Sequence, residues 1–347
     1  MSEFRSQHGS EAEWSPLERD ELAIVLSHYQ LGVISEIRDY RKGSRRAPKV
    51  RVTTDQGQYL LKRRAPGRDD LDRITFTHEL QRRLRHSKFP LPALIRTAAG
   101  STVVRIGERF YEVYEFIRGT PYDQGLQTTY QSGQALALFH RILAEFQPEW
   151  EPSAGHYHNA PVAAHLGVVP DKAQRGELRP TVEYLKQAYT QAATEVQRLG
   201  IEAWPRQIIH GDWHPGNMLY RGPQVVAVID YDTARRGQRV LDLANGALQF
   251  SVTRNDEDPT RWPDALDESR LKRFCRGYDS VKGCVISTAE LAALPWLMIE
   301  ALIVEAAIPI ATTGHFAGIE GGAFLQMVER KVRWLEDRVT HIPEMLA

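Results

Sequence analysis

The chain carries HGDWHPGN at residues 210–217 and VAVIDYD at residues 226–232. Asp212, inside a short polar turn, can accept a proton from a hydroxyl group or orient that group for reaction. Asn217 offers an amide oxygen and Asp230 a carboxylate, and Mg²⁺ prefers such hard ligands and takes few of them from a protein. The two stretches therefore predict a magnesium-dependent reaction centre.

The chain between these stretches is predicted to form a hairpin. Residues 218–220 and 225–229 have the pattern of short strands, and residues 221–224 contain the Gly-Pro pair of a turn. The second strand is apolar and ends directly before Asp230. We therefore expect both metal ligands at one end of the hairpin.

These two motifs resemble the catalytic loop of the aminoglycoside phosphotransferase and choline kinase superfamily, whose members carry HGDxHxxN followed by ID[FWY]. The resemblance implies transfer of the γ-phosphate of ATP, with Mg²⁺, to a hydroxyl group. It places Asp212 at the catalytic base and Asn217 and Asp230 at the magnesium ligands. His210 falls at the histidine that braces the loop. His214 falls where protein kinases have a lysine that touches the transferred phosphate.

The upstream chain has the pattern of a nucleotide-binding half. Residues 49–54 and 58–62 are predicted to pair as a β-hairpin. By resemblance, Lys62 takes the place of the lysine that holds the α- and β-phosphates. Its expected ion-pair partner is Glu79, on a predicted helix at residues 74–84 with an apolar stripe.

Two further nucleotide contacts rest on the resemblance. The loop that covers the phosphates is reduced to Gly43 and Ser44, since neither GxGxxG nor GxxxxGK[ST] occurs in the sequence. The β-rich stretch 109–119 resembles the hinge between two lobes. Backbone groups near Glu115 and Ile117 would then pair with the adenine edge.

Two residues are expected to support the loop or the core. The stretch 240–245, VLDLAN, resembles the start of a helix in the same superfamily. Asp242 would support the catalytic loop by accepting backbone hydrogen bonds, and a favourable charge at a helix N-terminus is the competing interpretation. His140, on a helix predicted for residues 130–146, is expected to pack in the core.

The predicted fold class is α/β (α+β): a bilobal protein-kinase-like fold with a small antiparallel-sheet N-lobe and a larger, mainly helical C-lobe. We expect a disordered tail at residues 1–14, an N-terminal helix and nucleotide-binding lobe at 15–117, and the helical lobe with the acceptor site at 118–347. Within the helical lobe, an irregular insertion is expected at 151–180 and a helix at 181–199.

Composition narrows the class of protein. Of the 347 residues, 42% are hydrophobic and 25% charged, which is ordinary for a globular protein, and the net charge of zero argues against a nucleic-acid binder. Two cysteines and no recognisable signal peptide favour a cytoplasmic protein, monomeric or homodimeric. The apolar run 294–311 contains Glu300 and Glu305, so a buried helix is favoured over a membrane span.

Three other functions stay open. One is a Ser/Thr protein kinase of the same fold, although Tyr231 and Asp232 stand where protein kinases have Phe-Gly. Another is a nucleotide-binding regulator without turnover. The third is a metal hydrolase, in which His210, Asp212 and His214 alternate as metal ligands with Asp230 and Asp232.

The acceptor is expected to be a small molecule of the homoserine, amino-alcohol, aminoglycoside or sugar class, because relatives with similar loops phosphorylate all of these. Candidate lining residues of its pocket are Trp213, Tyr231, Trp296, Glu300 and Glu305. The two glutamates are five residues apart and do not share one face of a straight helix, so at most one is expected to point inward.

Overall fold

The computed structural model describes residues 16–40, 47–152, 155–158, 160–172, 178–256, 258–316 and 318–347. The chain divides into two compact units. The first unit comprises Met1–Thr120, Gln147–Pro152 and Val226–Asp232. The second comprises Pro121–Phe146, Ser153–Val225 and Thr233–Ala347. The expected tail at residues 1–14 and the expected phosphate-covering residues Gly43 and Ser44 lie outside the described residues.

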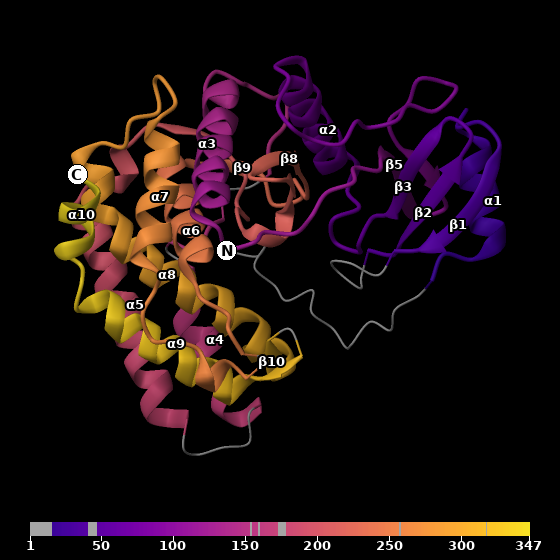
Figure 1. Cartoon of the computed structure of the whole chain (residues 1–347). Helices are drawn as coiled ribbons and strands as arrows, with labels where there is room; N and C mark the ends of the chain where they lie inside the picture. Colours follow the sequence, from indigo (N-terminus) through magenta and orange to yellow (C-terminus); the bar gives the residue numbers. More distant parts are fainter. Residues whose placement is uncertain are drawn as a thin grey trace. The chain divides into compact units, whose positions relative to one another are not determined.

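The first unit contains a five-stranded antiparallel sheet with the order β1-β2-β3-β5-β4, drawn in indigo and purple in Figure 1. Its strands are β1 (Ile34–Asp39), β2 (Lys49–Thr54), β3 (Gly57–Arg63), β4 (Val104–Ile106) and β5 (Arg109–Glu115). The predicted hairpin is confirmed, because β2 and β3 pair from Thr54 opposite Gly57 to Lys49 opposite Lys62.

One face of the sheet in the first unit packs against α1 (Arg19–Ser27) and the other faces α2 (Leu71–His86). Helix α1 contributes Val25 and Leu26 to an apolar cluster with Tyr111 and Val113 of β5. Side chains alternate between faces along a strand, so Glu112 points to the other face. There it meets His78 of helix α2. A buried carboxylate is therefore placed between the sheet and α2.

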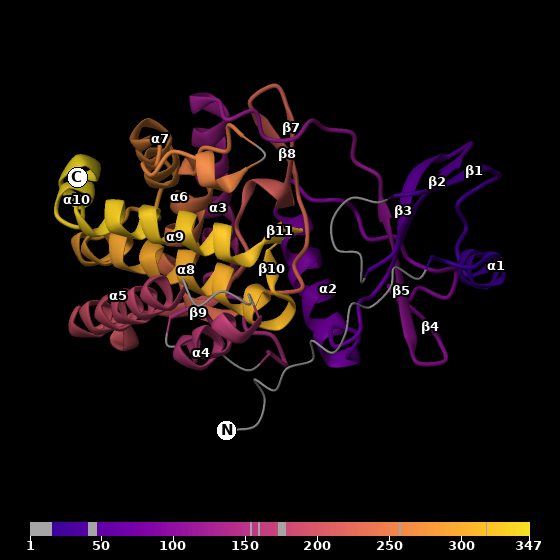
Figure 2. The same cartoon turned by 90° about the horizontal axis from the view of Figure 1, so that it is seen from below.

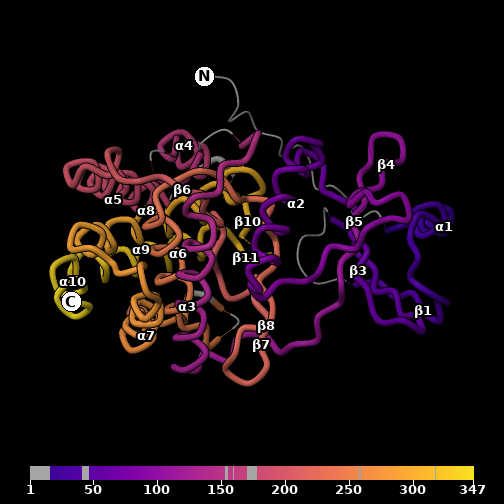
Figure 3. The backbone as a smooth tube through the Cα atoms, turned by 90° about the horizontal axis from the view of Figure 1, so that it is seen from above, coloured from indigo at the N-terminus to yellow at the C-terminus, as the bar shows by residue number. Residues whose placement is uncertain are grey.

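The second unit is mainly helical (Figures 2 and 3). Its helices are α3 (Leu126–Leu143), α4 (Val162–Lys172), α5 (Arg179–Arg198), α6 (Arg239–Ser251), α7 (Glu268–Asp279), α8 (Thr288–Thr313), α9 (Gly321–Glu336) and α10 (His341–Leu346). Two short strand pairs, β6 (Arg206–Ile209) with β9 (Arg235–Gln238) and β10 (His315–Phe316) with β11 (Ile319–Glu320), complete it. The hairpin predicted after the catalytic loop is present as β7 (Met218–Arg221) and β8 (Gln224–Val228).

Helix α8 is the central helix of the second unit and packs against α4, α5, α6 and α9. It begins with a capping box, in which Ser287 accepts from the Glu290 amide and Glu290 accepts from the Ser287 amide. Its length, and a mean hydropathy of 1.9 over its most apolar 18 residues, would allow a membrane span. However, 72% of that stretch is buried within the protein. The structure thus places α8 as the buried helix that the sequence predicts.

Helices α3 and α7 approach each other closely because each has a glycine at the contact. A Cβ atom on Gly133 would lie 2.0 Å from the carbonyl oxygen of Phe274, and one on Gly277 would lie 2.1 Å from that of Tyr130. Both distances are shorter than any van der Waals contact. The two glycines therefore set the spacing of α3, which carries His140 toward the catalytic loop.

The helix predictions for the second unit are largely confirmed, with one correction. The helices expected at residues 130–146 and 181–199 are present as α3 and α5. The irregular insertion expected at 151–180 is wrong for residues 162–172, which form α4. Val162, Leu166 and Val169 recur at helical spacing and are all buried, so a short amphipathic face stabilises this helix despite the many small residues around it.

Candidate active site

The HGDWHPGN loop follows strand β6, which pairs with β9 so that Ile209 lies opposite Arg235. His210 is fully buried, and its ring meets Trp213 edge-on at 5.3 Å between centroids. Trp213 is also fully buried and packs near Phe139 of α3. His210 and Trp213 thus anchor the loop in the core. Trp213 is therefore a core residue, whereas the sequence analysis expected it to line the acceptor pocket.

Asp212, His214 and Asn217 come together on this loop. The amide of Asn217 donates from Nδ2 to both the backbone oxygen and Oδ2 of Asp212, each at 3.0 Å. His214 Nε2 lies 3.5 Å from the same Oδ2, while its Nδ1 accepts from the Gly216 amide at 3.0 Å. The Asn217 amide is therefore fixed with its nitrogen toward Asp212, which leaves its oxygen as the group that a metal would take.

The charge of Asp212 is stabilised by these neighbours. Burial alone would raise the pKa of its carboxyl group, but the hydrogen bond and charge of His214, with His210 and the Asn217 amide, lower that pKa to about 2. Burial likewise would lower the pKa of His214, and the contact with Asp212 outweighs burial and raises it. Asp212 is therefore a carboxylate at neutral pH, which suits it to orient a hydroxyl group.

Asp242 holds the beginning of the loop. Its Oδ2 accepts from the His210 amide at 2.6 Å and its Oδ1 from the Gly211 amide at 2.8 Å. His140 of α3 contacts the same carboxylate at 3.1 Å and reaches the Tyr278 hydroxyl with its other ring nitrogen at 2.8 Å. The resemblance implies such backbone hydrogen bonds for Asp242. The contact with the His140 ring holds the Asp242 carboxylate in addition.

Gly211 is needed at this point of the loop. Its φ of 76° is in the left-handed region, and a Cβ there would lie 2.6 Å from the backbone oxygen of Thr233. Thr233 also donates from its hydroxyl to the His210 carbonyl at 3.0 Å. The close backbone approach at Gly211 is what lets Asp242 bond two successive amides.

Asp242→Asn is expected to lower the free energy of unfolding by about 1–3 kcal/mol, because an amide group cannot accept from both backbone amides and from His140, so one buried donor loses its partner. Urea unfolding at pH 7 measures this. The exposed Asp337→Asn is the matched control.

The pH dependence of this difference has a definite sign. Burial raises the pKa of Asp242, but His140, His210 and the backbone bonds outweigh burial and lower it. The stabilisation is then present above the unfolded-state pKa of about 4 and is lost as the pH falls through the lower folded-state pKa. If the difference in unfolding free energy between Asp242→Asn and the native protein were the same at pH 3 as at pH 7, this account of Asp242 would be contradicted.

Glu305 of α8 lies in the electrostatic field of the loop. Burial, with the charge of Asp212, raises the pKa of Glu305 to about 7, partly opposed by His214 and Arg254. Gln249 of α6 donates to its carboxyl group. Glu300, in contrast, is fully buried and pairs with His158 at 2.9 Å. Of the two glutamates, Glu305 is the one directed toward the catalytic loop.

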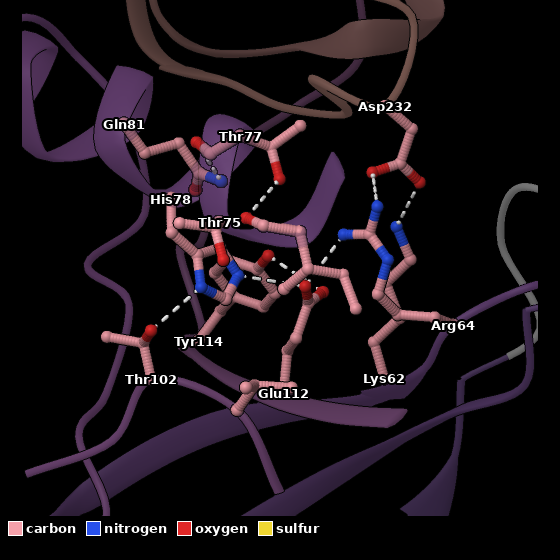
Figure 4. A network of polar contacts seen from close by, with 12 residues as sticks. Lys62, Arg64, Thr75, Thr77, His78, Gln81, Thr102, Glu112, Tyr114 and Asp232 are labelled. Carbon is pink, nitrogen blue, oxygen red and sulfur yellow. Dashed lines mark hydrogen bonds and ion pairs between the residues drawn. The ribbon is translucent and has the colours of Figure 1, made fainter. Parts of the chain in front are cut away.

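The first unit carries a second group of charged residues around Lys62 (Figure 4). Lys62 Nζ forms an ion pair with Asp232 Oδ2 at 3.0 Å, and Arg64 contacts Oδ1 of the same carboxylate at 2.9 Å. Arg64 also contacts Glu112 at 2.7 Å, and Glu112 accepts from His78 at 2.9 Å if the hydrogen is on Nε2. Charges of alternating sign therefore run from Lys62 to α2.

The expected ion pair between Lys62 and Glu79 is wrong in this structure. Lys62 pairs with Asp232, and the ion-pair partner of Glu79 is Arg82, at 3.8 Å. The buried face of α2 presents Thr77, His78 and Gln81, so Glu79 is turned away from the sheet. Residues one apart on a helix point about 100° apart, so the rotation that brings His78 to Glu112 directs Glu79 elsewhere.

Asp230 lies close to Lys62. Burial alone would lower the pKa of Lys62, but the carboxylates of Asp232 and Asp230 outweigh burial and raise it. The charges of Lys62, Asp230 and Asp232 also act on Lys49, whose pKa burial lowers. Asp230 has a φ of 64°, a left-handed conformation that aspartate and asparagine tolerate better than most residues. Two amines and two carboxylates thus share one region of the first unit.

At the expected hinge, two backbone amides already have protein partners. Glu115 donates to the Ala93 carbonyl at 2.8 Å, and Phe116 donates to the Gln58 carbonyl at 2.9 Å. Ile117 follows them beyond the end of β5. Of the two residues expected to contact adenine, the backbone of Ile117 is therefore the better candidate, because the Glu115 amide already has a partner.

Sequence reasoning missed several members of the charged network, namely Arg64, His78 and Glu112. Glu112 gave a signal, since it is a charged residue inside the apolar strand RFYEVYE and strand interiors carry such residues only with partners. Tyr231, expected to line a pocket, is buried and donates to the Val228 carbonyl at 3.0 Å.

Residues 36–284 match the sequence model of the family described as Phosphotransferase enzyme family. Homoserine kinase of Pseudomonas aeruginosa is 26% identical over 276 residues, which cover 76% of this chain and 78% of that protein. Two solved structures also resemble the chain. The microcompartment-associated aminopropanol kinase has a TM-score of 0.69 at 16% identity, covering 95% of this chain and 100% of that chain. Amicoumacin kinase hAmiN, in complex with AMP-PNP, Ca²⁺ and Ami, has a TM-score of 0.67 at 14% identity, covering 92% and 93%.

The similarity to these two solved structures confirms the predicted α/β kinase-like fold. Among the residues that the structure describes, no group of three or more His, Cys, Asp or Glu side chains could hold a metal ion. The metal-hydrolase alternative therefore gains no support from the described part of the chain.

Proposed function

Because this chain belongs to the phosphotransferase enzyme family and is a small-molecule phosphotransferase, we propose that it moves the γ-phosphate of ATP to the hydroxyl of a small amino acid or amino alcohol such as homoserine. One observation carries the proposal: the loop brings Asp212 together with Asn217, at 3.0 Å, and His214, at 3.5 Å, and the charge of Asp212 also acts on Glu305. This arrangement offers one carboxylate to a hydroxyl and another to an ammonium group.

Asp212 acts on the acceptor hydroxyl. With a pKa of about 2, its carboxylate is too weak a base to remove the proton from a resting alcohol. It can orient the oxygen in line with the phosphorus and accept the proton as transfer proceeds. Asn217 and His214 hold it in place through Oδ2, and the Nε2–H of His214 is also suited to donate to the transferred phosphate.

Asn217 and Asp230 would hold the magnesium ion. Both offer hard oxygen ligands, and the bonds from Asn217 Nδ2 to Asp212 direct the amide oxygen away from that residue. When bound, the metal neutralises charge on the phosphates of ATP. The donor set fits magnesium and is poor in the thiolate and imidazole ligands that zinc prefers.

Lys62 would bind the α- and β-phosphates. Its amine is held by Asp232, whose position is fixed in turn by Arg64 and by a bond from Arg73 to its backbone oxygen at 3.2 Å. Burial raises the pKa of Asp232, but Lys62 and Arg64 outweigh burial and lower it. A positioned ammonium group loses less entropy on binding phosphate than one on a mobile side chain.

The acceptor class follows from the charges near Glu305. Arg254 is exposed, and its positive charge lowers the pKa of Glu305, opposite to the effect of burial and of Asp212. Its guanidinium donates to Gln249 at 3.3 Å, and Gln249 also bonds Glu305. An α-amino acid carries an ammonium group that matches Glu305 and a carboxylate that matches Arg254. A side-chain hydroxyl would complete the acceptor.

Glu305→Gln is expected to raise the KM for homoserine about 10- to 100-fold with little change in the KM for ATP, because a charge-assisted bond to the ammonium group is lost. In the native protein the carboxylate form of Glu305 binds the ammonium group. Since its pKa is about 7, the KM should fall about tenfold between pH 6 and pH 8. Initial rates across this range measure both effects.

The variant supplies the control for the pH profile. Glu305→Gln should show no fall in KM over the same range, because glutamine does not titrate there. A variant whose KM for homoserine equals that of the native protein, or the same pH profile in both proteins, would contradict the role of Glu305 and leave phosphate transfer itself untouched.

The acceptor class is tested by ADP release in the presence of ATP and Mg²⁺ with a panel of hydroxyl compounds: homoserine, 1-amino-2-propanol, choline, kanamycin and glucose. Homoserine or the amino alcohol should give the highest kcat/KM. A preference for glucose, which has no ammonium group, would overturn the assignment of Glu305 and Arg254. Because both cysteines are free and buried, we place the reaction in the reducing cytoplasm.

A further inference from the structure

Lys331 of helix α9 is a charged residue in the core of the second unit, and no step of phosphate transfer uses it. Its side chain is fully buried, and its ammonium group donates to the backbone oxygen of Pro263. Burial lowers the pKa of Lys331 to about 8; Asp264 opposes this shift, and the charges of Arg330 and Arg254 add to it. A buried cation is costly for folding, and an apolar residue of similar size often stabilises a protein more. Packing alone therefore does not account for a lysine at this position.

Arg330, the preceding residue of α9, holds the same segment of the chain. Its Nε donates to Asp264 Oδ1 at 2.6 Å. Its guanidinium group also donates to the backbone oxygens of Thr260 at 3.1 Å and Trp262 at 3.5 Å. With the bond from Lys331 to Pro263, these contacts span residues 260–264. Two adjacent cations of α9 thus fix this segment largely through its backbone.

Trp262, in the middle of this segment, is held by further contacts of its side chain. Its indole Nε1 donates to the backbone oxygen of Asp256 at 2.6 Å. Phe324 of α9 meets the Trp262 ring edge-on at 6.3 Å between centroids. Phe324 and Lys331 lie two helical turns apart and therefore share one face of α9. The ring of Trp262 thus has a fixed position against that face.

Arg254 lies against Trp262. The carbon of its guanidinium group is 5.7 Å from the centroid of the Trp262 ring, within the range of a cation–π contact. Arg254 also donates to Gln249 at 3.3 Å, and Gln249 bonds Glu305. A fixed indole ring therefore limits the orientations of an exposed guanidinium group, close to the glutamate that we assign to the ammonium group of the acceptor.

We propose that Arg330 and Lys331 are positioning residues for the acceptor: by fixing residues 260–264 on α9 they keep Trp262 against Arg254, and so orient the guanidinium group for the carboxylate of an amino-acid acceptor. The proposal rests on the carboxylate-binding role proposed for Arg254. Both residues act through Trp262 and not by touching the acceptor. A side chain that is already held in place loses less conformational entropy on binding. Acceptors with a carboxylate should therefore gain from this arrangement, and acceptors without one should not.

Lys331→Met removes the ammonium group and leaves a side chain of similar length in the core. The KM for homoserine is expected to rise about 3- to 10-fold, the range for ordering one flexible side chain on binding. Homoserine amide, in which a neutral amide replaces the carboxylate, should keep its native KM, and so should ATP. Initial rates of ADP release measure these values. Arg330→Gln, at a half-buried position, should show the same pattern and provides the test if Lys331→Met does not fold.

The effect should depend on Arg254. In an Arg254→Gln background, Lys331→Met should not raise the KM for homoserine further, since the two residues act along one chain of contacts. The matched control is Val332→Ala, at the next residue of α9, which is also fully buried. This variant should lower the free energy of unfolding and leave the ratio of the KM values for homoserine and homoserine amide at its native value.

An equal rise in KM for homoserine and its amide would overturn the proposal, because a purely structural loss does not discriminate between them. A native ratio of these KM values in both Lys331→Met and Arg330→Gln would also overturn it, as would additive losses in the double variant with Arg254→Gln. Failure of the proposed function gives a different result: the native protein itself would then phosphorylate neither acceptor, or would have the same KM for both.

Discussion

Asp212→Asn is expected to lower kcat by about 10²- to 10⁴-fold and to leave the KM for ATP nearly unchanged. Asparagine has nearly the same shape, and its amide can still meet Asn217 and His214. It cannot accept the proton of the acceptor hydroxyl or stabilise the charge that develops on it. The loss should therefore fall on the chemical step and not on nucleotide binding.

Rates of ADP release with saturating ATP and homoserine measure this effect. The matched control is Asp20→Asn, an exposed aspartate of α1, which should retain native kcat. Circular dichroism and urea unfolding establish that the Asp212 variant is folded. A folded Asp212→Asn protein with more than a tenth of native kcat would show that another group activates the hydroxyl.

Asp230→Asn should lower kcat by about 10²- to 10³-fold and shift the Mg²⁺ concentration for half-maximal rate upward, because a negatively charged metal ligand becomes neutral. Asparagine is chosen because Asp230 has a φ of 64°, which asparagine tolerates about as well as aspartate. The backbone should therefore stay in place. An alanine at this position would mix strain with the loss of the ligand.

Titration of activity with Mg²⁺, at fixed ATP, separates metal affinity from catalysis. Asp232→Asn is the informative comparison, because its carboxylate holds Lys62 and Arg64 and is not assigned to the metal. That variant should raise the KM for ATP with a smaller change in the Mg²⁺ requirement. An Asp230→Asn enzyme with native Mg²⁺ dependence would remove Asp230 from the metal site.

Much of the catalytic loop could be predicted from sequence, because its residues are close together in the chain and each spacing has a local reason. Asp212 and Asn217 are five residues apart within one loop, and their contact depends on that loop alone. The β2–β3 hairpin was predictable for the same reason, since a short turn fixes its register.

The partner of Lys62 could not be predicted in this way. Lys62 and Asp232 are 170 residues apart, so no local pattern links them. Whether Glu79 points toward the sheet depends on the rotation of α2 about its axis. That rotation turns His78 toward Glu112 and leaves Glu79 with Arg82. Helical periodicity gives the buried face to within about one residue, and one residue is enough to exchange one partner for another.

Glu305 shows the same limit in the second unit. The sequence indicates only that Glu300 and Glu305 differ in direction along α8. Glu300 is fully buried and bonds His158 at 2.9 Å, whereas burial and the charge of Asp212 raise the pKa of Glu305 to about 7. The difference arises from packing against other segments, which a pattern within one helix does not contain.

Phosphorus-31 NMR of the native protein with ATP, Mg²⁺ and homoserine tests the central claim most directly. Transfer to the acceptor hydroxyl predicts a phosphomonoester resonance that grows as the γ-phosphate resonance of ATP declines, with no such signal from Asp212→Asn. Loss of the γ-phosphate only as inorganic phosphate, or phosphate bound to the protein itself, with every acceptor of the panel would contradict a small-molecule kinase.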